Sequence, residues 1–283
     1  MGKAFITAFE KKVMDTVEKY NLISPKDKVI VAVSGGKDST AVLYLLNKLG
    51  YKAEGLIIDL LIGKWSDQNL SNIQGFCDKH KIKLHVVNLR EEFGCSMCYF
   101  RSRVQVKHKL NNCLICGIIK RWLLNKKSRG LGATKIATGH NLDDGAETVL
   151  MNLFKGKLEM NMSMGPMTGI IRDKKFVPRI KPLYFCLNEE VRKYSESMGF
   201  PVVYEPCPCS VNVFRRKVRN ELKELEKKNS KIKMNIVSAF LEILPKIQER
   251  YKTTEKLNYC TRCGEPSRGE LCKMCDLLQK MTD

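Results

Sequence analysis

The sequence predicts an α/β protein with a doubly wound, mostly parallel sheet, followed by a small cysteine-rich knuckle. Three observations predict this fold class. Short β-branched runs alternate with segments of helical periodicity along most of the chain, as expected of parallel strands joined by helices. A glycine-rich turn joins the first of these strands to the helix that follows it. Two C-x-x-C pairs stand near the end of the sequence, in a segment too short to form a hydrophobic core of its own.

Each element is expected from its own sequence pattern. An amphipathic helix over residues 7–21 precedes a buried β-branched strand at Lys28–Val33, and the next helix carries Val42, Leu45, Leu46 and Leu49 on one face. Further strands are expected at Ala53–Asp59, Lys83–Asn88, Thr134–Thr138 and Pro201–Tyr204, and further helices near residues 67–80, 116–129, 143–154, 188–198, 213–228 and 231–252. Residues 156–182 are rich in Met, Gly and Pro, lack periodicity and are expected to form a loop over one end of the sheet.

The 283 residues are expected to divide into four parts. These are an N-terminal helix (residues 1–23), the α/β domain (24–210), a basic helical extension (211–254) and the C-terminal knuckle (255–283). A hydrophobic content of 43% and a charged content of 28% exclude a disordered or fibrous chain. No segment approaches the roughly 18 uninterrupted apolar residues that a membrane helix requires, and no secretory signal is visible near the N-terminus. We therefore expect a cytoplasmic protein with no membrane partner.

Positive charge predominates and is concentrated in one span. Lys and Arg total 50 against 30 Asp and Glu, a net charge of +20, and residues 93–142 contain no acidic side chain. The cations of that span are Arg101, Arg103, Lys107, Lys109, Lys120, Arg121, Lys126, Lys127, Arg129 and Lys135. A surface of one sign attracts polyanions and releases their counterions on binding. A lysine-rich solvated surface is the alternative interpretation, but the concentration of charge favours a nucleic acid as partner.

The glycine-rich turn has the composition of a phosphate-binding loop. It consists of Ser34, Gly35, Gly36, Lys37, Asp38 and Ser39, and it follows Ala32 and Val33 at the end of a strand. The glycines let the backbone approach a phosphate, and the helix N-terminus offers free N–H groups. The Walker pattern G-x-x-x-x-G-K-S/T is absent. The turn instead resembles the PP-loop of ATP pyrophosphatases, which implies an adenine nucleotide alpha hydrolase-like fold and ATP as ligand.

Two further strand ends are expected beside this loop, because ligands of doubly wound sheets lie beyond the carboxyl ends of the strands. Ile58, at the end of the second strand, is expected to flank the adenine. In the segment that ends a later strand and opens a helix, Gly139, Asp143 and Asp144 are expected to contact the nucleotide, with the two carboxylates holding Mg²⁺ or steering ATP. As an alternative, Asp143 is only the cap of that helix.

Twelve cysteines in a chain without a visible export signal indicate metal ligands or reactive thiols rather than disulfides. Cys113 and Cys116 open a helix, and Lys120 follows one turn after Cys116 on the same face. Cys207 lies after the last expected strand. The last four cysteines have the spacing of a structural zinc knuckle that closes one tetrahedral Zn²⁺ site; they are Cys260, Cys263, Cys272 and Cys275.

The order of these motifs resembles a known enzyme family. Five motifs follow one another as in the TtuA-type tRNA 2-thiouridine synthetases, a family that includes the catalytic subunit of the cytosolic thiouridylase. In chain order they are SGGKDS, C-x-x-C-G-x-x-K, G-H-N-x-x-D-D, E-x-C-P and C-x-x-C-x8-C-x-x-C. The resemblance runs from about residue 7 to residue 279. It implies an enzyme that uses ATP to adenylate uridine O2 in tRNA and to replace that oxygen with sulfur.

The same resemblance implies the cofactor and the partners. Cys113, Cys116 and Cys207 would bind a 4Fe–4S cluster with one iron left open. Lys120 and Asp144 would act in catalysis together with the two cysteines of the C-x-x-C pair. The partners implied are tRNA and a sulfur donor, either sulfide or a small thiocarboxylated carrier protein. A homodimer is implied by the resemblance alone.

Several alternatives stay open. Cys113 and Cys116 serve as a persulfide carrier without metal in a competing chemistry. A tRNA cytidine-32 2-thiolase shares the loop and the cluster, although the four C-terminal cysteines disfavour it. Two further alternatives explain less of the pattern. One is a PP-loop synthetase that acts on a small molecule, and the other is a non-catalytic, metal-containing RNA-binding protein. Three further points are open. The modified uridine is at position 34 or 54, the pair Cys95 and Cys98 has no assigned role, and Cys209 is an alternative to Cys207 as the third ligand.

Overall fold

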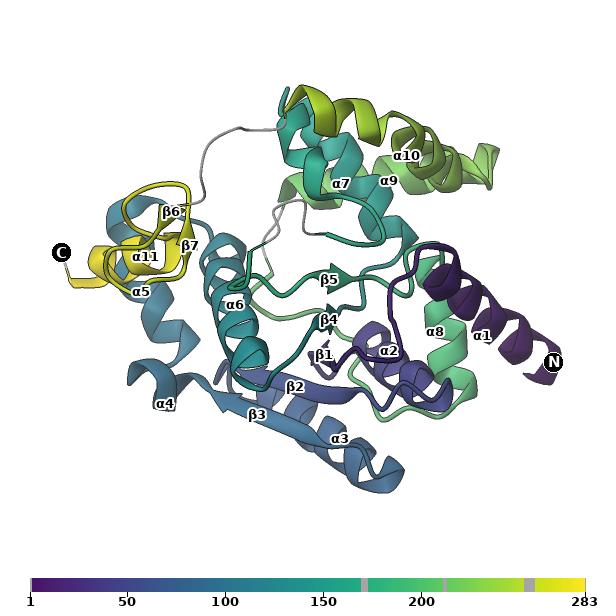
Figure 1. Cartoon of the computed structure of the whole chain (residues 1–283), viewed down its shortest axis with the longest axis horizontal. Coiled ribbons are helices and arrows are strands. Elements are labelled where there is room, and N and C mark those ends of the chain that lie inside the picture. Colours follow the sequence, from purple (N-terminus) through teal and green to yellow (C-terminus); the bar gives the residue numbers. More distant parts are fainter. Residues whose placement is uncertain (1, 169–172, 211–212, 252–257, 283) are drawn as a thin grey trace.

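A five-stranded parallel sheet forms the centre of the protein (Figure 1). The computed structural model describes residues 2–168, 173–210, 213–251 and 258–282. The strand order is β3-β2-β1-β4-β5, and every pair is parallel. The strands are β1 (Val29–Val33), β2 (Glu54–Asp59), β3 (Leu84–Asn88), β4 (Lys135–Ala137) and β5 (Arg179–Ile180). The predicted doubly wound parallel sheet is confirmed.

Helices connect the strands and extend the chain beyond the sheet. They are α1 (Gly2–Lys19), α2 (Lys37–Lys48), α3 (Lys64–His80), α4 (Leu89–Phe93), α5 (Met97–His108), α6 (Asn112–Gly130), α7 (Leu142–Phe154), α8 (Asn188–Ser197), α9 (Val213–Lys228), α10 (Ile232–Arg250) and α11 (Lys273–Thr282). A 3₁₀ helix, η1, spans Leu158–Ser163. A second, antiparallel sheet consists of β6 (Asn258–Tyr259) and β7 (Pro266–Ser267).

The two faces of the sheet bury two separate cores. Val29, Val31 and Val33 of β1 pack with α1, α2, α3 and α8 on one face. Ile30 packs with α5, α6 and α11 on the other. Successive side chains of a strand point to opposite faces, and helices cover both faces here, so β1 is apolar throughout rather than alternating.

Two groups of helices lie outside this sandwich. The helices α7, α9 and α10 pack on one another at the top of Figure 1, around a core that includes Val218, Leu222 and Val237. The short strands β6 and β7 and the helix α11 lie beside α5 and α6, at the other end of the molecule from α1 (Figure 1). No helix in the described part of the chain is both long and apolar enough to cross a membrane.

The structure corrects three expectations about the elements. The fifth strand is Arg179–Ile180, inside the segment expected to be a loop, whereas residues 201–204 form no strand. The new strand has only two residues between two prolines, so it carries no periodic signal. An unexpected helix, α5, occupies the basic span, and it buries Met97, Phe100 and Val104 at the spacing of one helix face. The first helix begins at Gly2 rather than at residue 7.

Candidate nucleotide and thiol site

A cavity of about 550 Å³ opens at the carboxyl ends of the strands, between the sheet and α6. Of the residues predicted from the sequence, those that line it are Ala32, Val33, Ser34, Gly36, Asp38, Ser39, Ile58, Lys120, Gly139 and Asp144. The chain leaves β1 for β2 on one side and later returns to β4 on the other. The cavity therefore lies at the switch point of the strand order, where doubly wound sheets bind their ligands.

The Ser34–Ser39 turn is held in shape by its own serine. The Ser39 hydroxyl accepts a hydrogen bond from the Ser34 N–H at 3.1 Å and donates one to the Gly36 carbonyl at 3.1 Å. Gly36 is the N-cap of α2 and makes no side-chain cap. The first N–H groups of α2 are thus left for an anion, as in other phosphate sites at helix N-termini.

Gly35 and Lys37 support this turn without lining the cavity. Gly35 has a φ of +76°, and a Cβ atom there would lie 2.5 Å from the side-chain oxygen of Asn69 on α3. Only glycine suits such a position. The Lys37 ammonium pairs with the Asp38 carboxylate at 2.7 Å, so its charge lies beside the loop rather than free in solution.

Gly139 allows the end of β4 to approach the start of α2. A Cβ atom at this position would lie 2.8 Å from the Asp38 carbonyl carbon and 2.8 Å from the Ser39 nitrogen. We expect Gly139→Ala to push the two segments apart, to lower the free energy of unfolding by about 1–3 kcal/mol, and to weaken ATP binding. Denaturant unfolding and ATP titration measure both effects.

Gly75→Ala is the matched control, because nothing lies within 4 Å of a Cβ atom at that position on α3. It replaces glycine inside an exposed helix and should raise stability by up to about 1 kcal/mol. Equal stability and ATP affinity for Gly139→Ala and the wild type would contradict the close-approach role.

The two carboxylates of the predicted acidic pair have separate environments. Asp144 lines the cavity. The Asp143 carboxylate instead binds the Lys233 ammonium at 2.7 Å and accepts the Asn188 N–H at 2.8 Å. Consecutive helix residues point about 100° apart, which explains the separation. The cap of α7 is Asn141, so the structure contradicts the alternative in which Asp143 is the cap, and Asp143 is also not a cavity residue.

One wall of the cavity is cationic, which the sequence pattern did not predict. Arg121 on α6 and Arg179 on β5 line it together with Lys120. Burial, and then the charge of Arg121, lower the pKa of Arg179 to about 10. Burial lowers the pKa of the neighbouring Lys181 to about 8, against the attraction of Asp144. The acid-free span included Arg121, but a two-residue strand gave no reason to place Arg179 beside it.

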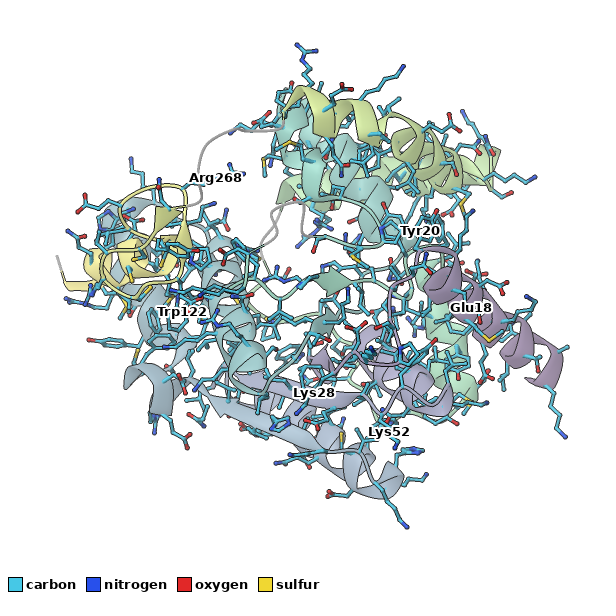
Figure 2. All side chains as sticks on the ribbon, in the orientation of Figure 1. Glu18, Tyr20, Lys28, Lys52, Trp122 and Arg268 are labelled. Atoms are coloured by element: carbon cyan, nitrogen blue, oxygen red, sulfur yellow. The ribbon has the colours of Figure 1, made fainter. Side chains whose placement is uncertain are left out.

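Two of the thiols predicted to bind the iron–sulfur cluster, Cys113 and Cys116, lie on α6, the helix whose Trp122 is labelled in Figure 2. Cys116 and Cys207 are half-buried and pack against the same core, while Cys113 is exposed at the start of α6. Burial raises the pKa of the Cys207 thiol, and the backbone N–H of Cys209 and the positive charge of Lys120 oppose that rise. The charge of Lys120 therefore acts on the Cys207 thiol, and the Lys120 side chain lines the cavity, whereas none of the three thiols does.

The donor set suits a cluster. All three thiols are free, and thiolates are the usual ligands of iron–sulfur clusters. In the described ranges, the only set of three or more His, Cys, Asp and Glu ligand atoms within 4.8 Å of one another is the C-terminal quartet. Cys113, Cys116 and Cys207 are therefore too widely spaced for one ion. A cluster, in which each thiolate binds a different iron, does not require the three sulfurs to lie that close together.

The four C-terminal cysteines form a compact ligand group. The sulfurs of Cys260, Cys263, Cys272 and Cys275 lie within 4.8 Å of one another. The Cys263 and Cys272 sulfurs are 3.6 Å apart, close to the edge of about 3.8 Å in a tetrahedron with 2.3 Å Zn–S bonds. Burial raises the pKa of Cys260, but N–H groups of Cys272, Cys263 and Arg262 outweigh it and lower the pKa to about 6. This geometry fits a tetrahedral metal ion.

The knuckle is tied to α6 and to the segment that leads into β5. Glu265 pairs with Arg129 of α6, with its Oε2 atom 3.0 Å from Nη1. The Lys175 ammonium donates to the Gly264 carbonyl at 2.5 Å, and the Asn125 amide of α6 donates to the Lys175 carbonyl at 2.7 Å. One network therefore joins the cysteine group to the helix that carries Lys120.

The chain is similar to known proteins in sequence and in fold. The sequence matches the PP-loop domain family over residues 6–226. A tRNA-5-methyluridine(54) 2-sulfurtransferase of Pyrococcus horikoshii is 34% identical over 94% of this chain and 83% of the relative. Cytoplasmic tRNA 2-thiolation protein 1 of Drosophila ananassae is 32% identical over 98% of this chain and 80% of its own length. The U34-tRNA thiolase NcsA from Methanococcus maripaludis, with its 4Fe–4S cluster, has a TM-score of 0.80 at 28% identity, covering 97% of this chain and 87% of that chain.

The fold, the loop and the family match define this chain as a PP-loop protein of the ATP-binding class. Within that class it belongs to the family of the tRNA-thiolating sulfurtransferases, because relatives above 30% identity, matched over most of their own length, carry those names. The resemblance inferred from the order of the motifs is confirmed, and so is the expectation that the chain is an enzyme.

Proposed function

We propose that this chain is a cytoplasmic, ATP-dependent tRNA sulfurtransferase that replaces O2 of a uridine with sulfur. One observation carries the proposal: Lys120 lines the nucleotide cavity and lies one helical turn after Cys116 on α6. A nucleotide in the cavity and sulfur near the cysteines would therefore meet at the same side chain. The names of the relatives, which act on tRNA or are called cytoplasmic, support the substrate and the compartment.

The first step activates the base. The adenine would lie against Ile58 and the phosphates against the Ser34–Ser39 turn, with Asp144 placed to hold Mg²⁺. Uridine O2 attacks the α-phosphorus of ATP, the bond to the β-phosphate oxygen breaks, and pyrophosphate leaves. The result is an O2-adenylated uridine, in which the former carbonyl oxygen is a leaving group.

The second step exchanges oxygen for sulfur. When bound to Cys113, Cys116 and Cys207, a 4Fe–4S cluster offers an iron without a protein thiolate that can carry the sulfur. Lys120 stabilises the negative charge that develops as the C2–O bond breaks and AMP departs. The sulfur comes from sulfide or from a carrier protein whose thiocarboxylate is hydrolysed to a carboxylate. It attacks C2 and forms the C2–S bond as the C2–O bond to AMP breaks. We also propose Zn²⁺ for the C-terminal knuckle and a homodimer as the assembly.

Nucleoside analysis of tRNA tests the activity in cells. A strain that lacks the gene should lose 2-thiouridine or its 5-substituted derivatives, and mass spectrometry of digested tRNA measures the loss. A plasmid copy of the gene should restore the nucleoside, whereas a copy with Lys120→Ala should not. Loss of 2-thiocytidine with 2-thiouridine unchanged would contradict the choice of base and favour the cytidine-32 thiolase. No change in either nucleoside would favour the non-catalytic RNA-binding protein.

A further inference from the structure

Arg121 and Arg179 form a pair of cations in the cavity that the chemistry above does not use. They come from different elements, α6 and β5, and the Arg179 guanidinium donates to the Arg121 carbonyl at 3.3 Å. In the described residues, the arginines in ion pairs are Arg129, Arg192, Arg215 and Arg219. Arg121 and Arg179 are not among them, so two neighbouring guanidinium groups line the cavity without a carboxylate partner.

The position of Arg121 relates the pair to the thiols. A Cβ atom on Gly117 would lie 2.9 Å from one terminal nitrogen of Arg121, so the glycine that follows Cys116 leaves room for this guanidinium. Burial lowers the pKa of Arg121, and the neighbouring Cys116 opposes that shift. Arg121 therefore lines the cavity while its guanidinium covers the glycine next to Cys116.

Arg179 lies on the other side of β1 from the expected adenine site. Ile58 lies in β2 on one side of β1, whereas Arg179 lies in β5, beyond β4 on the other side. At about 4.8 Å between strands, the three steps from β2 to β5 span roughly 14 Å across the sheet. The phosphates of ATP have other binding partners, namely the N-terminus of α2 and the serines of the PP-loop. The arginine pair in the cavity lining is therefore available to a second anionic ligand.

We infer that Arg121 and Arg179 bind a phosphodiester group of the RNA, next to the uridine that reacts. This inference rests on the proposed function and adds a phosphate subsite to it. Guanidinium groups bind phosphate oxygens through paired hydrogen bonds in a fixed planar geometry. A backbone phosphate held there would place its own base between the PP-loop and Cys116. The pair would thus act in positioning the substrate.

Binding of unmodified tRNA without ATP or sulfur donor tests the inference. We expect Arg179→Gln and Arg121→Gln to weaken tRNA binding about tenfold at fixed ionic strength, and to lower the slope of log K against log salt by roughly 0.7–0.9. Arg179→Lys keeps the charge and loses the paired geometry, so it should keep the slope and still bind weakly. Arg192→Gln is the matched control. That exposed arginine of α8 lies outside the acid-free span, pairs with Glu196 at 2.8 Å, and should change the affinity less than twofold.

Steady-state kinetics separate this phosphate from those of ATP. The KM for tRNA should rise in Arg179→Gln, and the KM for ATP should stay at the wild-type value. A raised KM for ATP with unchanged tRNA binding would overturn the inference and assign the pair to the triphosphate. Unchanged tRNA binding and unchanged KM values would overturn it outright. If the wild type bound tRNA but formed no thiolated nucleoside, the proposed function would fail while the binding comparison stayed valid.

Discussion

Cys113→Ala should purify without the iron–sulfur cluster and should form no detectable thiolated uridine. The thiol is exposed and does not line the cavity, so the fold and ATP binding should be unchanged. The loss should exceed the roughly 10–100-fold that removal of an outer-shell group costs at a metal site, because a direct ligand is removed. Anaerobic purification, an iron assay, the visible absorption spectrum and nucleoside analysis measure the result.

Cys98→Ala is the matched control for this experiment. Cys98 is also an exposed thiol in a C-x-x-C pair near the start of a helix, and its loss should leave iron and activity at wild-type levels. Full iron content in Cys113→Ala would refute the cluster assignment. Wild-type protein that is free of iron and still fully active would favour the persulfide chemistry.

Cys275→Ser should remove one bound zinc ion per chain and unfold the C-terminal knuckle. Structural zinc contributes about 10–16 kcal/mol of apparent binding free energy in small zinc modules, so residues 258–282 would lose most of their stability without it. Met274 and Leu277 of α11, both 1% exposed, would then leave the core that they share with α5 and α6. Metal analysis and limited proteolysis measure the two changes.

Glu265→Gln separates the metal from the docking of the knuckle. It keeps all four cysteines and removes the charge that Arg129 binds, so zinc should stay while the knuckle binds α6 more weakly by about 1–3 kcal/mol. The thiolation rate should fall less than in Cys275→Ser. A Cys275→Ser protein with its full zinc content and a protease-resistant tail would contradict the structural role.

The sequence alone predicts motifs that are contiguous in the chain. It does not predict pairs of distant residues that only the fold brings together. The Ser34–Ser39 turn and the C-terminal cysteines each fall within one short segment, so their spacing alone indicated a loop and a ligand group. Arg121 and Arg179 lie 58 positions apart and meet only because β5 pairs with β4 beneath α6. Neither local sequence predicts this contact.

The elements follow the same distinction. Strands with three or more β-branched or aliphatic residues in a row are predicted within one or two residues, as for β1 and β2. The two residues of β5 have no period to detect, and residues 201–204 form no strand although they are partly apolar. The neighbours Asp143 and Asp144 show that the sequence does not predict different environments even for adjacent residues of one helix. Their separation depends on Lys233 of α10, which the sequence pattern does not place.

The origin of the oxygen in AMP tests the central claim most directly. Purified, reconstituted protein is given ATP, a sulfur donor and tRNA in which O2 of the target uridine carries oxygen-18. Because the mechanism transfers that oxygen to the α-phosphorus before the C2–O bond breaks, mass spectrometry should find one labelled oxygen in AMP for each 2-thiouridine formed. Thiolated tRNA accompanied by unlabelled AMP, or formed equally well without ATP, would show that the nucleotide does not activate the base and would contradict the account.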